Sequence, residues 1–245
     1  PHDGRRIERL GGRPAACPTA LAFDGPNRLL VTLGSQAHLP SQWKHDLMSH
    51  GRSGSVWAVD LRSGADERLA DGLAWPCGIA TDGQGVVVSE AWRHRLLRLG
   101  GKPVLDRLPG YPGRILPQGE GWLLAVFAPR NQLVEFVLRE PDYRQTMMRE
   151  IAPAHWIAPA LHAATSFLEP LQGGAVRQMG ELKPWAPSRS YGLVVQLDRD
   201  FLPVASWHSR ADGRRHGITS LAHWQGRLIA GAQGTGEALI LEETA

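Results

Sequence analysis

Short runs of alternating apolar and polar residues occur along this chain in a repeated order. Four segments combine a strand-like run, a turn at a glycine and a second apolar run, and they begin at Pro18, Pro76, Pro112 and Ile218. Each of them predicts a β-hairpin. Alternating runs that suit outer strands follow at 54–61, 95–99, 132–138 and 192–197, and short fourth strands at 67–69, 103–105 and 202–205. Four strands in a unit of roughly 40 residues are typical of a propeller blade.

The repeat therefore predicts an all-β chain, folded as a single β-propeller domain over residues 1–245 with four recognisable blades. The blades begin near residues 17, 75, 111 and 216, and a leading strand, Arg5 to Leu10, is expected to belong to the blade before them. Two stretches interrupt the repeat. Residues 38–50 form a polar insert with several histidines, and residues 146–190 combine a helix-like apolar pattern with a proline-rich end. The second insert either covers the channel mouth as a lid or extends away from the blades into solvent.

Composition narrows the class of partner. The 28 glycines and 18 prolines suit many short strands joined by tight turns. The formal net charge is +3, and the arginines are scattered along the chain instead of forming a stripe, so nucleic-acid binding is not expected. No apolar run approaches the ~20 residues of a membrane span, and no residue pattern indicates a compartment. Cys17 and Cys77 are too few for a disulfide framework or a zinc site, although one disulfide between them remains open.

Three segments, at 71–80, 88–98 and 108–115, have the residues, order and spacing of the central blades of a known family. They resemble the strictosidine synthase-like β-propellers, which are relatives of the gluconolactonases and paraoxonases. Members of that family have six blades, and this chain matches about the last four. The resemblance therefore implies a propeller of the six-bladed type whose first two blades are absent, supplied by a partner chain, or replaced by another closure.

The resemblance also bears on the metal. Calcium-dependent relatives hold the ion on the propeller axis with Asn and Asp side chains at the starts of inner strands. Here the corresponding positions hold Thr19-Ala20, Cys77 and Gly113-Arg114. Calcium takes about six to eight oxygen ligands, which a hydroxyl, a thiol and a guanidinium do not supply. We therefore expect the calcium site to be lost, with no metal or other cofactor.

Strictosidine synthesis itself is not expected. Strictosidine synthases use a glutamate on the last inner strand as the acid and base, and the alignment places Ser220 there. A serine hydroxyl does not transfer that proton near neutral pH.

Three side chains remain as catalytic candidates. Cys77 begins an inner strand, so its thiol is either a channel nucleophile or a small buried residue. His216 is a candidate general base, or else an exposed or capping histidine. Ser220 stands four residues after His216, which on a strand would put both on one face as a nucleophile and its base, although no carboxylate is assigned to orient the pair.

Four further side chains are candidate ligand contacts. Thr19 and Arg114 are expected at the channel, where the guanidinium of Arg114 suits a carboxylate or another anion. Glu90 and Arg95 match a charged pair of the family, and they either face the ligand or form a salt bridge between blades.

Two functions follow, and the sequence leaves open whether the chain is an enzyme. The first is a metal-independent, hydrolase-like enzyme that acts on a small molecule in the axial channel, by lactonase, esterase or strictosidine synthase-like lyase chemistry. The second is a non-catalytic propeller that binds a ligand or a protein through the inserts at 38–50 and 147–185. The first requires an open channel lined by Thr19, Cys77, Arg114, His216 and Ser220. The second tolerates a filled channel and expects an apolar patch elsewhere.

Overall fold

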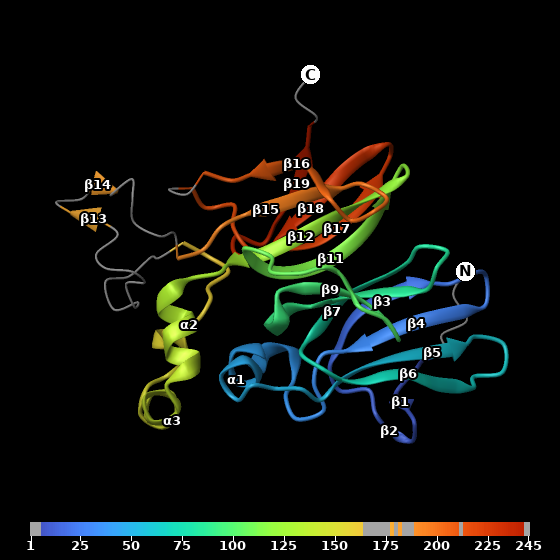
Figure 1. The fold of residues 1–245 in the computed structure, drawn as a ribbon, viewed down its shortest axis with the longest axis horizontal. Coiled ribbons are helices and arrows are strands. Elements are labelled where there is room, and N and C mark those ends of the chain that lie inside the picture. Colours follow the sequence, from blue (N-terminus) through green and yellow to red (C-terminus); the bar gives the residue numbers. More distant parts are fainter. Residues whose placement is uncertain (1–5, 164–176, 179–180, 183–188, 211–212, 243–245) are drawn as a thin grey trace.

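In the computed structural model, which describes residues 6–163, 177–178, 181–182, 189–210 and 213–242, four antiparallel sheets follow one another along the chain (Figure 1). The first sheet contains β3 (Pro18–Phe23), β4 (Arg28–Leu33), β5 (Gly54–Asp60) and β6 (Asp66–Leu73). The second contains β7 (Pro76–Thr81), β8 (Val86–Glu90), β9 (Arg95–Arg98) and β10 (Pro103–Leu105). The third contains β11 (Gly110–Gln118), β12 (Gly121–Pro129), β15 (Leu193–Leu197) and β16 (Pro203–His208). The fourth has three strands, β17 (Ile218–Trp224), β18 (Arg227–Ala232) and β19 (Glu237–Leu241).

The sheets pack face to face in chain order, as propeller blades do. Each inner strand neighbours the next, from β3 to β7, from β7 to β11 and from β11 to β17. Alternate residues of each strand point into the space between two sheets, because successive side chains of a strand face opposite ways. Leu30, Val56 and Ile79 fill the first space. Beside the second space Trp122 stacks on Phe201, with 5.4 Å between the ring centroids. Leu221 is buried in the third space. The chain is therefore all-β with four propeller-like blades, whereas the six-bladed type stays a prediction.

The expected outer strand at 132–138 is wrong, because these residues form helix α2 (Gln132–Arg139). The Asn131 side chain caps the helix by accepting a hydrogen bond from the Leu133 amide at 2.9 Å. Val134 and Val137, three residues apart, are both buried on one helix face. The third strand of this blade is β15 instead, which reaches the sheet after an insert that contains α2.

The insert is helical earlier than the expected range of 146–190. Helix α3 (Pro141–Glu150) and the short helix η3 (Pro153–His155) follow α2 directly. Two strands of two residues each, β13 (Arg177–Gln178) and β14 (Glu181–Leu182), form one antiparallel pair. Most of the remaining expected insert lies outside the described residues.

The leading strand also differs from the expectation, since it does not join a blade. β1 (Arg9–Leu10) pairs with β2 (Arg13–Pro14) in a separate hairpin, and Arg5 lies outside the described residues. Leu10 packs on Val31 and Val59, so the hairpin covers part of the outer face of the first sheet. Gly11 turns this hairpin with φ of +56°, where a side chain would overlap the ring of Trp57.

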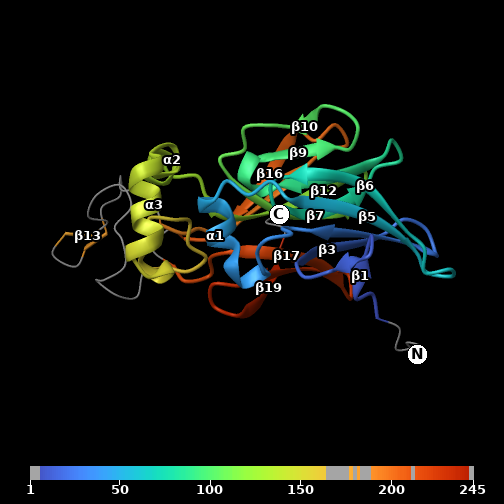
Figure 2. The ribbon, with the colours of Figure 1, turned by 90° about the horizontal axis from the view of Figure 1, so that it is seen from below.

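The helices gather at one end of the molecule, as Figures 1 and 2 both show. The insert at 38–50 forms the short helix η1 (Pro40–Gln42) and α1 (Trp43–Met48), and these lie at the same end as α2 and α3. Next to them, side chains from the blades and their connections form one apolar cluster with side chains of the helices. Its largest members are Trp75, Tyr111, Phe127, Trp156, Met48 and Met147. This aromatic cluster fills the end of the blade array at which the inner strands start. No helix in the described part of the chain is long and apolar enough to cross a membrane.

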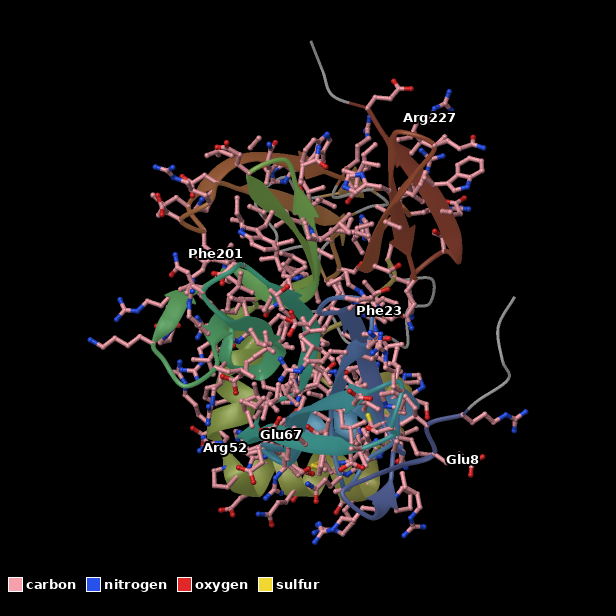
Figure 3. All side chains as sticks on the ribbon, turned by 90° about the vertical axis from the view of Figure 1, so that its right-hand side faces the viewer. Glu8, Phe23, Arg52, Glu67, Phe201 and Arg227 are labelled. Carbon is pink, nitrogen blue, oxygen red and sulfur yellow. The ribbon has the colours of Figure 1, made fainter. Side chains whose placement is uncertain are left out.

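The outer faces of the first and last sheets carry exposed apolar side chains. Leu21 and Phe23 of β3 are 53% and 68% exposed, and Trp224 of β17 and Ile240 of β19 are 58% and 49% exposed. In Figure 3 Phe23 lies on the side of the first sheet that is turned toward the last sheet. The apolar contact patch of the second function, like a partner chain or missing blades at this place, stays a prediction.

Substitutions on the two faces of the first sheet should differ sharply in their effect on stability. Phe23→Ser changes an exposed residue and is expected to alter the free energy of unfolding by less than about 0.5 kcal/mol. Leu30→Ala removes a side chain that is fully buried between two sheets and should cost about 2–5 kcal/mol. Urea denaturation monitored by tryptophan fluorescence measures both. A loss for Phe23→Ser as large as that for Leu30→Ala would mean that this face is covered in solution.

Candidate functional site

The inner strands share an irregularity at their first residues. The pairing of β3, β7, β11 and β17 with the following strand shifts register between Pro18 and Ala20, Pro76 and Gly78, Pro112 and Ile115, and Ile218 and Ser220. A bulge inserts an unpaired residue and redirects its side chain. Two of the sequence-predicted residues, Thr19 and Cys77, occupy equivalent bulge positions in successive blades. The structure therefore places them in corresponding environments, as the repeat predicts.

The polar atoms of these bulge residues bind the next blade. Thr19 Oγ1 donates to the carbonyl oxygen of Pro76 at 2.5 Å. One blade further, Cys77 Sγ donates to the carbonyl oxygen of Pro112 at 3.0 Å. Ser89 Oγ, beside Cys77, donates to the carbonyl oxygen of Gly113 at 2.8 Å. Thr19 and Cys77 thus connect blades through the backbone.

The thiol of Cys77 is not prepared for nucleophilic attack. Burial raises its pKa to about 12, although the hydrogen bond between Cys77 and Ser89 and the charge of Arg114 act in the opposite direction. The reactive form of cysteine is the thiolate, so at neutral pH this group remains protonated. Burial also raises the pKa of Cys17, and both cysteines are free, so the disulfide that the sequence left open is not formed.

Arg114 extends from the third blade to the first. Its Nη1 donates to the carbonyl oxygen of Leu21 on β3 at 3.3 Å. The guanidinium therefore bonds a backbone carbonyl, and its expected contact with an anionic ligand stays a prediction.

The expected pairing of His216 with Ser220 is wrong. His216 precedes β17 and is only 1% exposed, and its Nδ1 lies 2.7 Å from Ser190 Oγ while its Nε2 lies 2.9 Å from the carbonyl oxygen of Arg210. Both ring nitrogens are thus occupied by groups other than Ser220, which is exposed on β17. The sequence analysis missed Ser190, because 26 residues separate it from His216.

Glu90 and Arg95 form an ion pair inside one blade and not between blades. Glu90 is fully buried at the end of β8, and its Oε2 accepts a hydrogen bond from Arg95 Nε of β9 at 2.6 Å. Its Oε1 accepts from the Ala74 amide at 2.9 Å and lies 3.1 Å from Arg93 Nη1. The carboxylate therefore holds the connection between β6 and β7 in place, together with two arginines.

Three cavities of the described chain contain none of the five channel residues of the first function in their lining. The most basic cavity lies off the axis, has a volume of about 450 Å³, and includes Arg95 from the predicted set. We call it the basic groove. Its lining residues are His50, Trp92, Arg93, His94, Arg95, Asp106, Arg107, Arg130, Glu135, Leu138 and Arg139. Five arginines against two carboxylates give this small area an excess of positive charge.

Backbone contacts assemble the basic groove from separate segments. The short helix η2 (Ala91–Arg93) and the start of β9 form one side. His94 Nδ1 lies 2.9 Å from the carbonyl oxygen of Gly110, and the Leu108 amide donates to the carbonyl oxygen of His94 at 2.9 Å. The Arg130 amide donates to the carbonyl oxygen of Pro109 at 2.8 Å, which brings the start of α2 to the same place.

The ion pairs show which positive charges are already neutralised. Arg93 and Arg95 bind Glu90, as above, and Arg130 Nη2 lies 2.8 Å from Glu135 Oε2. His94 Nε2 lies 3.5 Å from the other oxygen of Glu135.

After these ion pairs are formed, two arginines of the groove have no ion-pair partner among the described residues. His94 and Arg130 together lower the pKa of Glu135 to about 2, against the opposing effect of burial, so Glu135 stays ionised. Arg107 and Arg139 are exposed and have no ion-pair partner among the described residues. They are the two groove cations available to an anion.

Backbone strain concentrates in the same groove. Six residues other than glycine have a positive φ in the described chain, and three of them line the basic groove: His50 at 53°, His94 at 50° and Arg107 at 56°. This left-handed conformation costs a residue with a side chain about 1–2 kcal/mol. Such strain persists where the surrounding structure enforces it, and it clusters at functional sites.

A sequence signal for the groove exists but is weak. Arg93, His94 and Arg95 form a short basic run, whereas Arg107, Arg130 and Arg139 are isolated arginines on other segments. Among the described residues, no three His, Cys, Asp or Glu side chains gather as metal ligands would. The expected loss of the calcium site stays a prediction.

No family model matches this chain, and no curated protein matches it. Two solved structures are similar over most of its length. The computationally designed protein Ika4 is 11% identical with a TM-score of 0.46, and the alignment covers 97% of this chain and 98% of Ika4. A candidate gluconolactonase is 12% identical with a TM-score of 0.49, and the alignment covers 94% of this chain but 60% of that protein. The assignment of blades therefore rests on the strand order and packing described above.

The pH dependence of thiol alkylation should report the environment of Cys77. We expect native protein to react slowly with iodoacetamide at pH 8, and the rate at Cys77 to keep rising above pH 10 because its pKa is raised to about 12. Unfolded protein should react quickly at pH 8, near the ordinary thiol pKa. Peptide mass spectrometry assigns the modified cysteine. Rapid alkylation of native Cys77 at pH 7 would show instead that the thiolate is accessible.

Proposed function

We propose that this chain is a non-catalytic propeller that binds an anionic small molecule in the basic groove. One observation carries the proposal: Arg107 and Arg139 line the same cavity without an ion-pair partner among the described residues, while their neighbours Arg93, Arg95 and Arg130 are paired. Two guanidinium groups in a cavity suit a carboxylate or another planar anion.

The state of the predicted channel supports a binding role. The aromatic cluster fills the end where the inner strands start. Thr19, Cys77 and Arg114 direct polar atoms at backbone carbonyls of other blades. Since these groups already have partners and the Cys77 thiol is protonated at neutral pH, little on the axis remains to attack a substrate.

Anions should stabilise the protein through Arg107 and Arg139. We expect millimolar acetate, benzoate and hexanoate to raise the Tm of the intact chain at constant ionic strength, and the corresponding neutral amides to have no effect, because a ligand that binds only the folded state stabilises it. The double variant Arg107→Gln/Arg139→Gln should bind at least roughly tenfold more weakly, since a hydrogen bond to a charged group contributes about 1.5–3 kcal/mol.

A matched control removes the same amount of charge elsewhere. Arg62 and Arg199 are exposed in turns outside the groove, so Arg62→Gln/Arg199→Gln should keep the full shift in Tm. An equal loss in both double variants would mean that the anions act through net charge alone. Absence of any shift in the unmodified chain would overturn the proposal.

A second candidate function, ester or lactone hydrolysis, has one contact in its favour. With the Nε2 proton of His216 donated to the Arg210 carbonyl oxygen, Nδ1 is unprotonated and accepts the hydroxyl proton of Ser190. In this relay Ser190 Oγ would attack the ester carbonyl, His216 would return the proton to the departing alkoxide, and water would then hydrolyse the acyl group. Both side chains are almost fully buried, so substrate access requires this region to open.

The relay predicts which variant loses esterase activity. If the chain turns over 4-nitrophenyl butyrate, Ser190→Ala should lower kcat by at least about a hundredfold. Ser220→Ala and Cys77→Ala should leave kcat within about twofold, because neither side chain contacts His216. Turnover measured by absorbance of the released phenolate tests this. Activity that survives in Ser190→Ala, or that disappears in Cys77→Ala, would rule out the relay.

A further inference from the structure

The basic groove adjoins a second cavity of different character. This second cavity has a volume of about 580 Å³, and its lining residues are Pro109, Arg130, Asn131, Gln132, Glu135, Phe136, Arg139 and Glu140. Arg130, Glu135 and Arg139 line both cavities. Because Arg130 and Glu135 are paired with each other, Arg139 is the unpaired charge at the junction.

One face of α2 forms the wall of the second cavity. Gln132 and Phe136 are four residues apart and lie on one side of the helix, with Val134 and Val137 buried on another, and Glu140 follows at the end of the helix. Phe136 is 55% exposed, although it is a large apolar residue. Pro109 faces the same cavity. The wall thus presents an apolar contact beside the unpaired Arg139.

Unsatisfied polar groups lie at the same place. Asn131 is 4% exposed; its Oδ1 caps α2, while its Nδ2 is buried and has no hydrogen-bond partner among the described residues. The same part of the chain offers no partner to the hydroxyl of Tyr111, which is fully buried beside His94. An unpaired buried donor costs stability, and Asn131 lines the second cavity, so an acceptor bound there at the start of α2 would offset this cost.

We infer that the ligand is an amphiphilic carboxylate, with a carboxylate group and an apolar chain or ring of about six carbons. This inference rests on the proposed anion-binding function and names the class of ligand. The carboxylate binds Arg139 at the junction and Arg107 in the basic groove, and the apolar part lies over Pro109 and Phe136. The affinity for the ligand then has two contributions: a charge contribution from the two arginines, and an apolar contribution from Pro109 and Phe136.

Isothermal titration of the full chain with three probes separates the two contributions. We expect hexanoate to bind at least roughly tenfold more tightly than acetate, because each methylene removed from water adds to affinity. Hexan-1-ol should bind more weakly than hexanoate by a similar factor. Phe136→Ala should bring hexanoate to the affinity of acetate without changing acetate itself. Tyr143→Ala, which removes an exposed aromatic from α3 outside both cavities, should change neither.

The outcomes distinguish this inference from the function on which it rests. Equal affinities for hexanoate and acetate, both lost in Arg107→Gln/Arg139→Gln, would overturn the apolar subsite and leave anion binding intact. Hexan-1-ol binding as tightly as hexanoate would overturn both, because charge would then contribute nothing. Hexanoate binding that Phe136→Ala leaves unchanged would also overturn the subsite. Loss of binding on Phe136→Ala with the Tm of that variant unchanged would support it.

Discussion

The first three blades of this chain are joined by hydrogen bonds from a side chain at the start of one inner strand to a backbone carbonyl at the start of the next. Thr19 bonds Pro76 in this way, and Cys77 bonds Pro112. The geometry requires the strands to approach closely, and Gly78 permits it, because a Cβ there would overlap the carbonyl oxygen of Gly113. The same contact determines what the axis can do, since a hydroxyl or thiol that holds a neighbouring blade is not available to a substrate.

This constraint favours a ligand site off the axis, as proposed above. The helices α1, α2 and α3 pack at the end where the inner strands start, with Met48, Val137 and Met147 against aromatic side chains of the blades such as Tyr111 and Phe127. One of these helices, α2, also forms a wall of the basic groove. The helix that packs on this cluster therefore also contributes to the groove, where arginines from a loop and a helix come together. Fold and function are separable here, as they are in other propeller-like scaffolds.

The sequence predicts the blades well because their signals are local. Each hairpin that begins at Pro18, Pro76 or Pro112 combines alternation with a glycine turn, and both are read within about 20 residues. Residues 132–138 lack this combined signal, because the spacing of Leu133, Val134 and Val137 suits either a strand or an amphipathic helix. The cap at Asn131 and the burial of only one side decide for the helix.

The candidate site is less predictable, for a different physical reason. The groove depends on contacts such as that of His94 with Gly110, and on which arginines already have a carboxylate partner. Residue types reveal neither. Arg95 was identified by resemblance, yet its charge is neutralised by Glu90, while Arg107 and Arg139 carry no motif at all. The same holds for His216, whose partner Ser190 is distant in the chain.

The left-handed backbone conformation of Arg107 costs stability at a residue that the proposed ligand would contact. Glycine adopts this conformation without steric cost, so a search for more stable variants of this chain would favour glycine at position 107. Such a variant would lose one of the two unpaired cations of the groove. Proteins commonly gain stability at the expense of strained functional positions. A library selected for thermal resistance alone would thus drift away from binding at this residue, and one selected for binding would retain the strain.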